Sequence, residues 1–186
     1  DCWHRDLAAY TGKYFGYAGI GDWLFDALCH LLEHESQQVG VADAVAAINE
    51  YQAPIIIVDM GTANTISVID KNKNVIGGLL MPGVLVSLDA LTASASQLNG
   101  ISIEKPKDII GKNTKDCMKS GVIYGQAAMI DGLVDRIEAR IEDKATVIVT
   151  GGLSKVIVPF CEHEVIHDED LLLKGLRTIY DMNTRA

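Results

Sequence analysis

The chain has 186 residues, of which 48% are hydrophobic and 22% charged, with a formal net charge of -9. This length suits one domain, or at most two small ones, and supplies enough apolar material for a core without disulfides. The acidic balance argues against partners that are nucleic acids or anionic membranes. Four scattered cysteines and the lack of a long apolar run predict a cytoplasmic protein with free thiols.

The first 38 residues differ in composition from the rest and contain both tryptophans. Apolar residues recur at helical spacing over residues 23–34, and Asp22 is placed to cap that helix. We therefore expect two units: a helical N-terminal segment of unknown role over residues 1–38, and the main folded unit over residues 39–186.

The main unit shows a change of period after its first helix, which is predicted over residues 41–51. Ile55 to Val58 is a continuous β-branched run, typical of a strand buried on both faces. Two more strands follow after links too short for a crossover, so all three pair as antiparallel hairpins. After the third strand we expect a helix over residues 84–98 and a long helix that ends near residue 142. A strand over 146–150, a helix after 152, a strand over 165–166 and a helix over 171–182 complete the unit. The fold class is thus α/β, with a mixed sheet of order βββαβαβα.

Asp59-Met60-Gly61-Thr62 forms the strongest local motif, at the end of the buried strand. Gly61 is able to take a positive φ and expose successive backbone N–H groups, and Thr62 adds a hydroxyl donor. Asp59 is placed to hold a cation beside a phosphate. The alternative is an ordinary hairpin whose polar side chains satisfy their own backbone. Aspartic proteases also use Asp-x-Gly-Thr, but the long predicted helices exclude their all-β fold.

Thr150-Gly151-Gly152 is the second motif, between a buried strand and a helix. A glycine turn at a helix N-terminus lets an adenosine or a phosphate approach the backbone closely. The alternative is a short turn that needs glycine only for its geometry.

Together the two motifs resemble a lobe of the actin, hexokinase and Hsp70 superfamily, which has a ribonuclease H-like, actin-like ATPase fold. Residues 39–183 resemble, more closely, the C-terminal half of a type III pantothenate kinase. The resemblance rests on several motifs in the right order and spacing: Asp59 to Ala63, Ile76-Gly77-Gly78, Met81-Pro82-Gly83, Ser87 to Leu91, Ile110 to Thr114, Ile130-Asp131-Gly132, Thr150-Gly151-Gly152 and Leu171 to Leu176.

The resemblance implies a homodimeric kinase that transfers the γ-phosphate of ATP to pantothenate, in the first step of coenzyme A biosynthesis. It implies a monovalent cation, potassium or ammonium, bound at Asp59, with magnesium as a possible companion of ATP. The residues implied to contact ATP are Gly61, Thr62, Gly151 and Gly152. Those implied to contact pantothenate are Gly40 and Thr114.

Two departures from the family pattern bear on activity. The family has an N-terminal lobe with its own Asp-x-Gly-Asn-Thr phosphate loop, and this sequence contains no such motif. The family also places a Gly-x-Asp motif, whose aspartate is the general base, before the helix that begins here at Val41. In this chain Gly40 meets Val41 directly, and Asp43 is expected to be a capping or solvent-facing carboxylate. The catalytic base is therefore unassigned, and the alternative is a non-catalytic pseudokinase or a dimerising, ligand-binding lobe.

Two groups of histidines are spaced in ways that metals use. His30 and His34 lie one helical turn apart but lack a third ligand, so a surface pair is expected. Cys161, His163 and His167 straddle a predicted helix end and a strand, and we expect no metal there.

Overall fold

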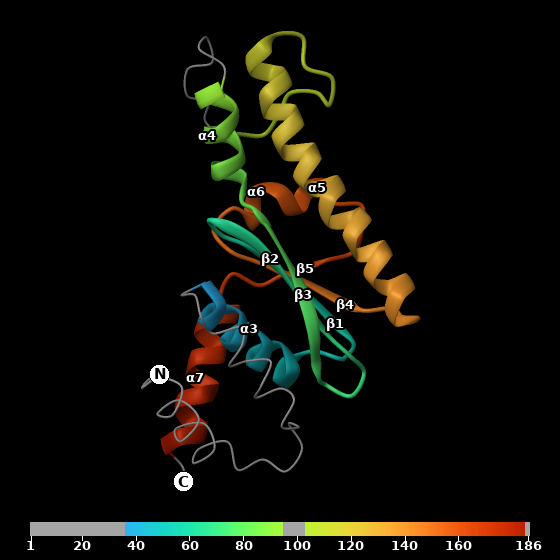
Figure 1. The fold of residues 1–186 in the computed structure, drawn as a ribbon, viewed down its shortest axis with the longest axis vertical. Coiled ribbons are helices and arrows are strands. Elements are labelled where there is room, and N and C mark those ends of the chain that lie inside the picture. The colour runs from blue at the N-terminus through green and yellow to red at the C-terminus, as the bar shows by residue number, and fades with distance from the viewer. Residues whose placement is uncertain (1–35, 95–102, 185–186) are drawn as a thin grey trace.

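The computed structural model describes residues 36–94 and 103–184. Within them the strands and helices follow the predicted order (Figure 1). The elements are α3 (Ser36–Glu50), β1 (Ile55–Met60), β2 (Ala63–Ile69), β3 (Val75–Pro82), α4 (Val84–Ser94), α5 (Thr114–Ile141), β4 (Thr146–Thr150), α6 (Ser154–Ile157), the 3-10 turn η1 (Val158–Phe160), β5 (Ile166–His167) and α7 (Leu171–Thr184). The predicted helix at 23–34 and the pair His30 and His34 lie outside the described residues, so the division at residue 38 stays a prediction.

Several boundaries differ from those read off the sequence. Helix α3 begins at Ser36 and runs through Gly40, whereas the sequence predicted a start at residue 41. Strand β5 lies one residue later than expected. It pairs with β4 so that Ile166 lies opposite Ile148 and His167 opposite Val149.

The five strands form one mixed sheet in the order β3-β2-β1-β4-β5. Strand β1 pairs antiparallel with β2 and parallel with β4, and β5 extends the parallel side. The register of β1 on β4 sets Asp59 opposite Thr150. The carboxyl ends of these two parallel strands therefore meet at one edge of the sheet, where open α/β sheets bind their ligands.

Helices cover both faces of the sheet (Figure 1). Side chains of α5 and α6 pack with Ile56, Val58 and Met60 of β1 on one face. Side chains of α3 and α7 pack with Ile55 and Ile57 on the other. This alternation explains why residues 55–58 read as a continuous apolar run: each face of β1 has its own hydrophobic core.

Helices α3 and α7 lie in backbone contact, and a polar network joins them to the sheet. Asp168 is buried and accepts hydrogen bonds from the Tyr51 hydroxyl and the Lys174 ammonium, both at 2.7 Å. Burial alone would raise the pKa of Asp168, but these bonds and the Asp170 amide hold that pKa below its ordinary value. Lys174 also binds Glu50 at 2.8 Å, which links the end of α3 to α7.

None of the helices in the described ranges is both long enough and apolar enough to cross a membrane.

Candidate functional site

A cavity of about 250 Å³ opens where β1 and β4 end. It brings together Asp59 from β1 and the Gly151-Gly152 turn that follows β4, as the two sequence motifs predicted. Other lining residues come from α3, from α6, from the link between β5 and α7, and from the start of α7. The lining set is Asp43, Asp59, Thr150, Gly151, Gly152, Ser154, Lys155, Glu169 and Leu172.

Gly151 is a position that only glycine fills. Its φ is +92°, and a Cβ built there would lie 2.6 Å from Asp59 Oδ1 and from the Met60 backbone nitrogen. A Cβ on Gly152, by contrast, would meet nothing within 4 Å. The turn therefore packs directly against the Asp59 carboxylate and leaves open space over Gly152, where a ligand can reach the backbone.

The helix that follows this turn is short. Helix α6 has 4 residues, from Ser154 to Ile157. A single turn of helix adds little macrodipole, so the glycine backbone and the lining side chains must supply most of any attraction for a ligand.

The Gly61 turn differs from its prediction. Gly61 does not adopt a positive φ, and its N–H donates to the Ala63 carbonyl at 3.2 Å. The prediction of a row of exposed backbone amides at Gly61 is thus wrong, because the Gly61 amide forms a hydrogen bond within the turn between β1 and β2. The left-handed glycine of the site is Gly151 instead.

The prediction for Asp43 is also wrong. It is neither a helix cap nor a solvent-facing carboxylate: it lies within α3, is 1% exposed and lines the cavity. Its Oδ1 has no hydrogen-bond partner among the described residues. Burial, then the nearby Asp59 and Asp168 carboxylates, raise the pKa of Asp43 from 3.8 to about 7.

The cavity lining suits a hard cation. Burial raises the pKa of Asp59, which indicates that its carboxylate has too few favourable partners in the protein. The one basic lining residue, Lys155, pairs with Glu169 at 2.9 Å. The buried Asp43 carboxylate, which has an unpartnered oxygen, and the half-buried Asp59 carboxylate therefore leave the site negative, and potassium, ammonium or magnesium would find oxygen ligands there. Among described residues, no group of three or more Cys, His, Asp or Glu is arranged to hold a metal ion.

Four predicted contact residues lie outside the cavity lining: Gly61, described above, and Thr62, Thr114 and Gly40. Thr62 is exposed in the hairpin turn, where its carbonyl accepts the Gly83 N–H at 3.1 Å. Thr114 is exposed at the first residue of α5, and Gly40 lies partly buried on α3. Their roles toward ATP and pantothenate stay predictions.

Sequence reasoning missed four lining residues: Ser154, Lys155, Glu169 and Leu172. Ser154 and Lys155 directly follow the glycine turn, so their positions held a usable signal. Glu169, in the link between β5 and α7, and Leu172, on α7, reach the cavity through the packing of distant segments, which no local pattern reveals.

Two solved structures share the arrangement of this chain. A conserved putative Baf family transcriptional activator from Campylobacter jejuni aligns with a TM-score of 0.54 at 22% identity, over 78% of this chain and 65% of that one. The Alp12 filament structure aligns with a TM-score of 0.52 at 13% identity, over 79% of this chain and 52% of that one. The sheet order and the helices on both faces are those of an actin-like ATPase lobe, as the sequence predicted.

Sequence comparison identifies a family among the proteins with this fold. The family model described as type III pantothenate kinase matches residues 30–136. The type III pantothenate kinase of Halalkalibacterium halodurans is 45% identical over 143 residues, which make up 77% of this chain and 56% of that protein. The same enzyme of Acidothermus cellulolyticus is 38% identical over equal shares. The chain belongs to the type III pantothenate kinase family, and it spans about half the length of these curated relatives.

Proposed function

We propose that this chain is the phosphate-handling lobe of a kinase that transfers the γ-phosphate of ATP to pantothenate, in the first step of coenzyme A biosynthesis. The observation that carries the proposal is the meeting of Asp59, Gly151 and Gly152 in one cavity at the carboxyl ends of two parallel strands. Family membership supplies the substrates.

Phosphoryl transfer needs positioning and charge neutralisation more than covalent help from the protein. Gly151 and Gly152 would accept the nucleotide, while Gly61 and Thr62 would contact its phosphates. Asp59 would hold potassium or ammonium, and magnesium would arrive with ATP; such cations offset the phosphate charge against a negative lining. Thr114 and Gly40 would contact pantothenate.

Asp43 is the proposed proton acceptor for the pantothenate hydroxyl. It lines the same cavity as Asp59, it has an unpartnered oxygen, and its pKa of about 7 suits a general base at neutral pH. Asp43 would thus replace the aspartate of the Gly-x-Asp motif, which this sequence lacks between Gly40 and Val41.

A homodimer in the cytoplasm is the proposed assembly and location. Strand β3 is an edge of the sheet, and Leu80 on it is 69% exposed. Leu85 and Leu91 on the adjoining α4 are also exposed. Apolar side chains on a sheet edge and the next helix favour burial against another chain over exposure to water.

A non-catalytic, ligand-binding lobe is the second candidate. The direct junction of Gly40 with Val41 favours it, because the general base of the family pattern is missing there.

Turnover separates the two candidates. With the purified chain in potassium buffer, ADP release should require both ATP and pantothenate. Asp59→Ala should slow it by about a hundredfold or more, since charge at the reacting phosphates is then poorly held. The exposed Asp108 provides a matched control, Asp108→Ala, which should turn over normally. Equal rates in wild type and Asp59→Ala would contradict the role of Asp59. No turnover by a folded wild type would favour the non-catalytic lobe.

A further inference from the structure

Ser154 ties the glycine turn to a histidine that neither sequence motif includes. The Ser154 side chain is fully buried at the first residue of α6. Its Oγ donates to the Gly151 carbonyl at 2.5 Å and lies 2.7 Å from Nε2 of His167. The Gly151 backbone in turn packs against the Asp59 carboxylate. A series of direct contacts thus runs from His167 to Asp59 in the cavity lining.

The positions of the hydrogens in these contacts follow from counting the donors and acceptors. A serine hydroxyl has one hydrogen, and a carbonyl only accepts, so the Ser154 proton goes to Gly151. His167 must then bring its own hydrogen on Nε2 and donate it to Ser154 Oγ. On the other side of the ring, Nδ1 lies 3.9 Å from Glu169 Oε1, too far for a hydrogen bond that would need a proton on Nδ1. The geometry therefore selects the Nε2–H tautomer of His167.

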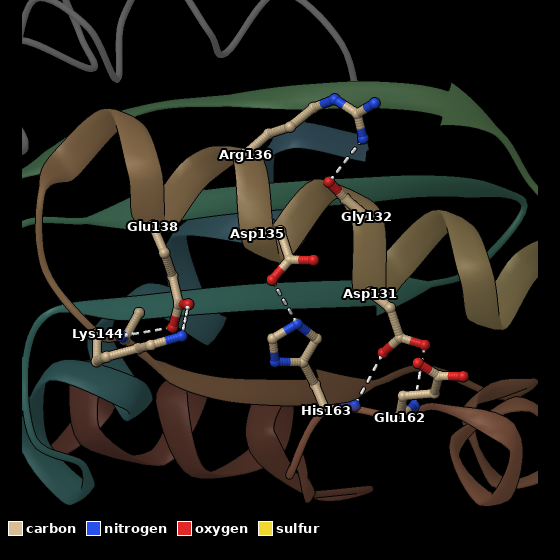
Figure 2. Close-up of polar contacts among 9 residues, drawn as sticks. Asp131, Gly132, Asp135, Arg136, Glu138, Lys144, Glu162 and His163 are labelled. Atoms are coloured by element: carbon tan, nitrogen blue, oxygen red, sulfur yellow. Dashed lines mark hydrogen bonds and ion pairs between the residues drawn. The ribbon is translucent and has the colours of Figure 1, made fainter.

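The strand that carries His167 is anchored to α5 just before it begins. Figure 2 shows Asp131 and Asp135 of α5 pointing toward the segment that holds Glu162 and His163. The Asp131 carboxylate accepts the backbone N–H groups of Glu162 and His163 at 2.9 and 3.0 Å. The His163 ring lies 3.0 Å from Asp135 Oδ1. These contacts fix the segment from which β5 starts, and pairing with β4 then sets His167 beside Ser154.

We propose that His167 is a positioning residue for the nucleotide turn: through Ser154 it holds the Gly151 carbonyl, and thereby keeps the Gly151-Gly152 backbone seated against Asp59. The expected consequence is tighter nucleotide binding, and this part of the inference rests on the proposed function. The hydrogen-bond relay from His167 to Gly151 is independent of any ligand. His167 itself does not line the cavity, so it acts only through Ser154.

Nitrogen-15 NMR of the labelled full chain tests the relay directly. Long-range proton–nitrogen correlations of the neutral His167 ring should show a protonated Nε2 and an unprotonated Nδ1. A ring that carries its proton on Nδ1 would overturn the proposal, because Nε2 could not then donate to Ser154.

Two isosteric variants separate positioning from simple packing. The amide nitrogen of His167→Gln reaches the place of Nε2, whereas that of His167→Asn reaches only the place of Nδ1. We expect the Gly151 and Gly152 amide resonances to stay in place in His167→Gln and to move in His167→Asn. Ser154→Ala removes the bond to the Gly151 carbonyl itself, so it should move these resonances at least as far as His167→Asn does, and adding His167→Asn to Ser154→Ala should cause no further change. Equal glycine shifts in the Gln and Asn variants would contradict the relay.

Titration with Mg·ADP tests the consequence. His167→Gln should bind within about twofold of wild type, and His167→Asn about three- to tenfold more weakly, the range expected for one lost hydrogen bond. Ile166→Leu, on the same strand, is the control and should bind as wild type does. If the wild type gives no saturable response while the tautomer and the glycine shifts agree with expectation, the proposed function fails and the relay stands. If the Gln and Asn variants bind equally well, the positioning role is overturned.

Discussion

Asp43→Asn should stabilise the protein at alkaline pH and leave its stability almost unchanged at acid pH. The folded-state pKa of Asp43 is raised to about 7, from 3.8 in an unfolded chain. The folded state therefore holds a proton that the unfolded state releases between these two values, and stability falls as pH rises through that window. Above pH 7 the buried charge costs about 2 to 4 kcal/mol, which asparagine removes without changing the size of the side chain.

Urea unfolding of wild type and Asp43→Asn at about pH 8.5 and about pH 4 measures this difference. Asp89→Asn, at an exposed carboxylate on α4, is the matched control and should change stability little at either pH. A stabilisation by Asp43→Asn of the same size at both pH values would show that ionisation of Asp43 is not its cause. The same variant should lose turnover if Asp43 accepts the substrate proton, so a gain in stability with a loss of activity is the combined signature.

Gly175→Ala should be among the most damaging single substitutions in the described part of the chain. A Cβ at Gly175 would lie 1.9 Å from the Ala42 carbonyl oxygen and 2.4 Å from its carbon. These are backbone atoms of α3, so they yield only if α3 and α7 move apart. Overpacking of this kind costs about 1 to 3 kcal/mol or more. Because Asp43 and Leu172 line the cavity from these two helices, the same movement should also disturb the site.

Gly125→Ala is the matched comparison. Gly125 is exposed within α5, and a Cβ there would meet nothing within 4 Å. Alanine is the better helix former, so Gly125→Ala should stabilise the protein by up to about 1 kcal/mol. Thermal and urea unfolding of the two variants should thus give effects of opposite sign. Equal stability of the Gly175 and Gly125 variants would contradict the close packing of α3 on α7.

The sheet could be predicted from the sequence because its signals are local. The β-branched run at 55–58 marks the central strand, and the short links after it permit only hairpins. The two glycine motifs then fall at the ends of β1 and β4, and the parallel register brings them together.

The other half of the site depends on contacts between distant residues. Helix α3 is rich in alanine and valine on every side, so its sequence did not show which face meets the sheet, and Asp43 was expected to cap the helix or to face solvent. The close packing of Gly151 on Asp59 and Met60 joins residues that lie far apart in the sequence. The bond of His167 with Ser154 likewise requires β5 to be paired on β4. Such features follow from packing, and no periodicity in the sequence reports them.

The cavity at the ends of β1 and β4 is proposed to bind a nucleotide. The most direct measurement is a titration of the labelled chain with Mg·ADP in potassium buffer, followed at the Gly151 and Gly152 amides. Saturable shifts are expected at these two glycines, with weak affinity because the chain spans about half the length of its curated relatives, and the shifts should be lost in Gly151→Ala. Saturable binding with no movement of either glycine resonance, or unchanged binding by Gly151→Ala, would contradict a nucleotide site in this cavity.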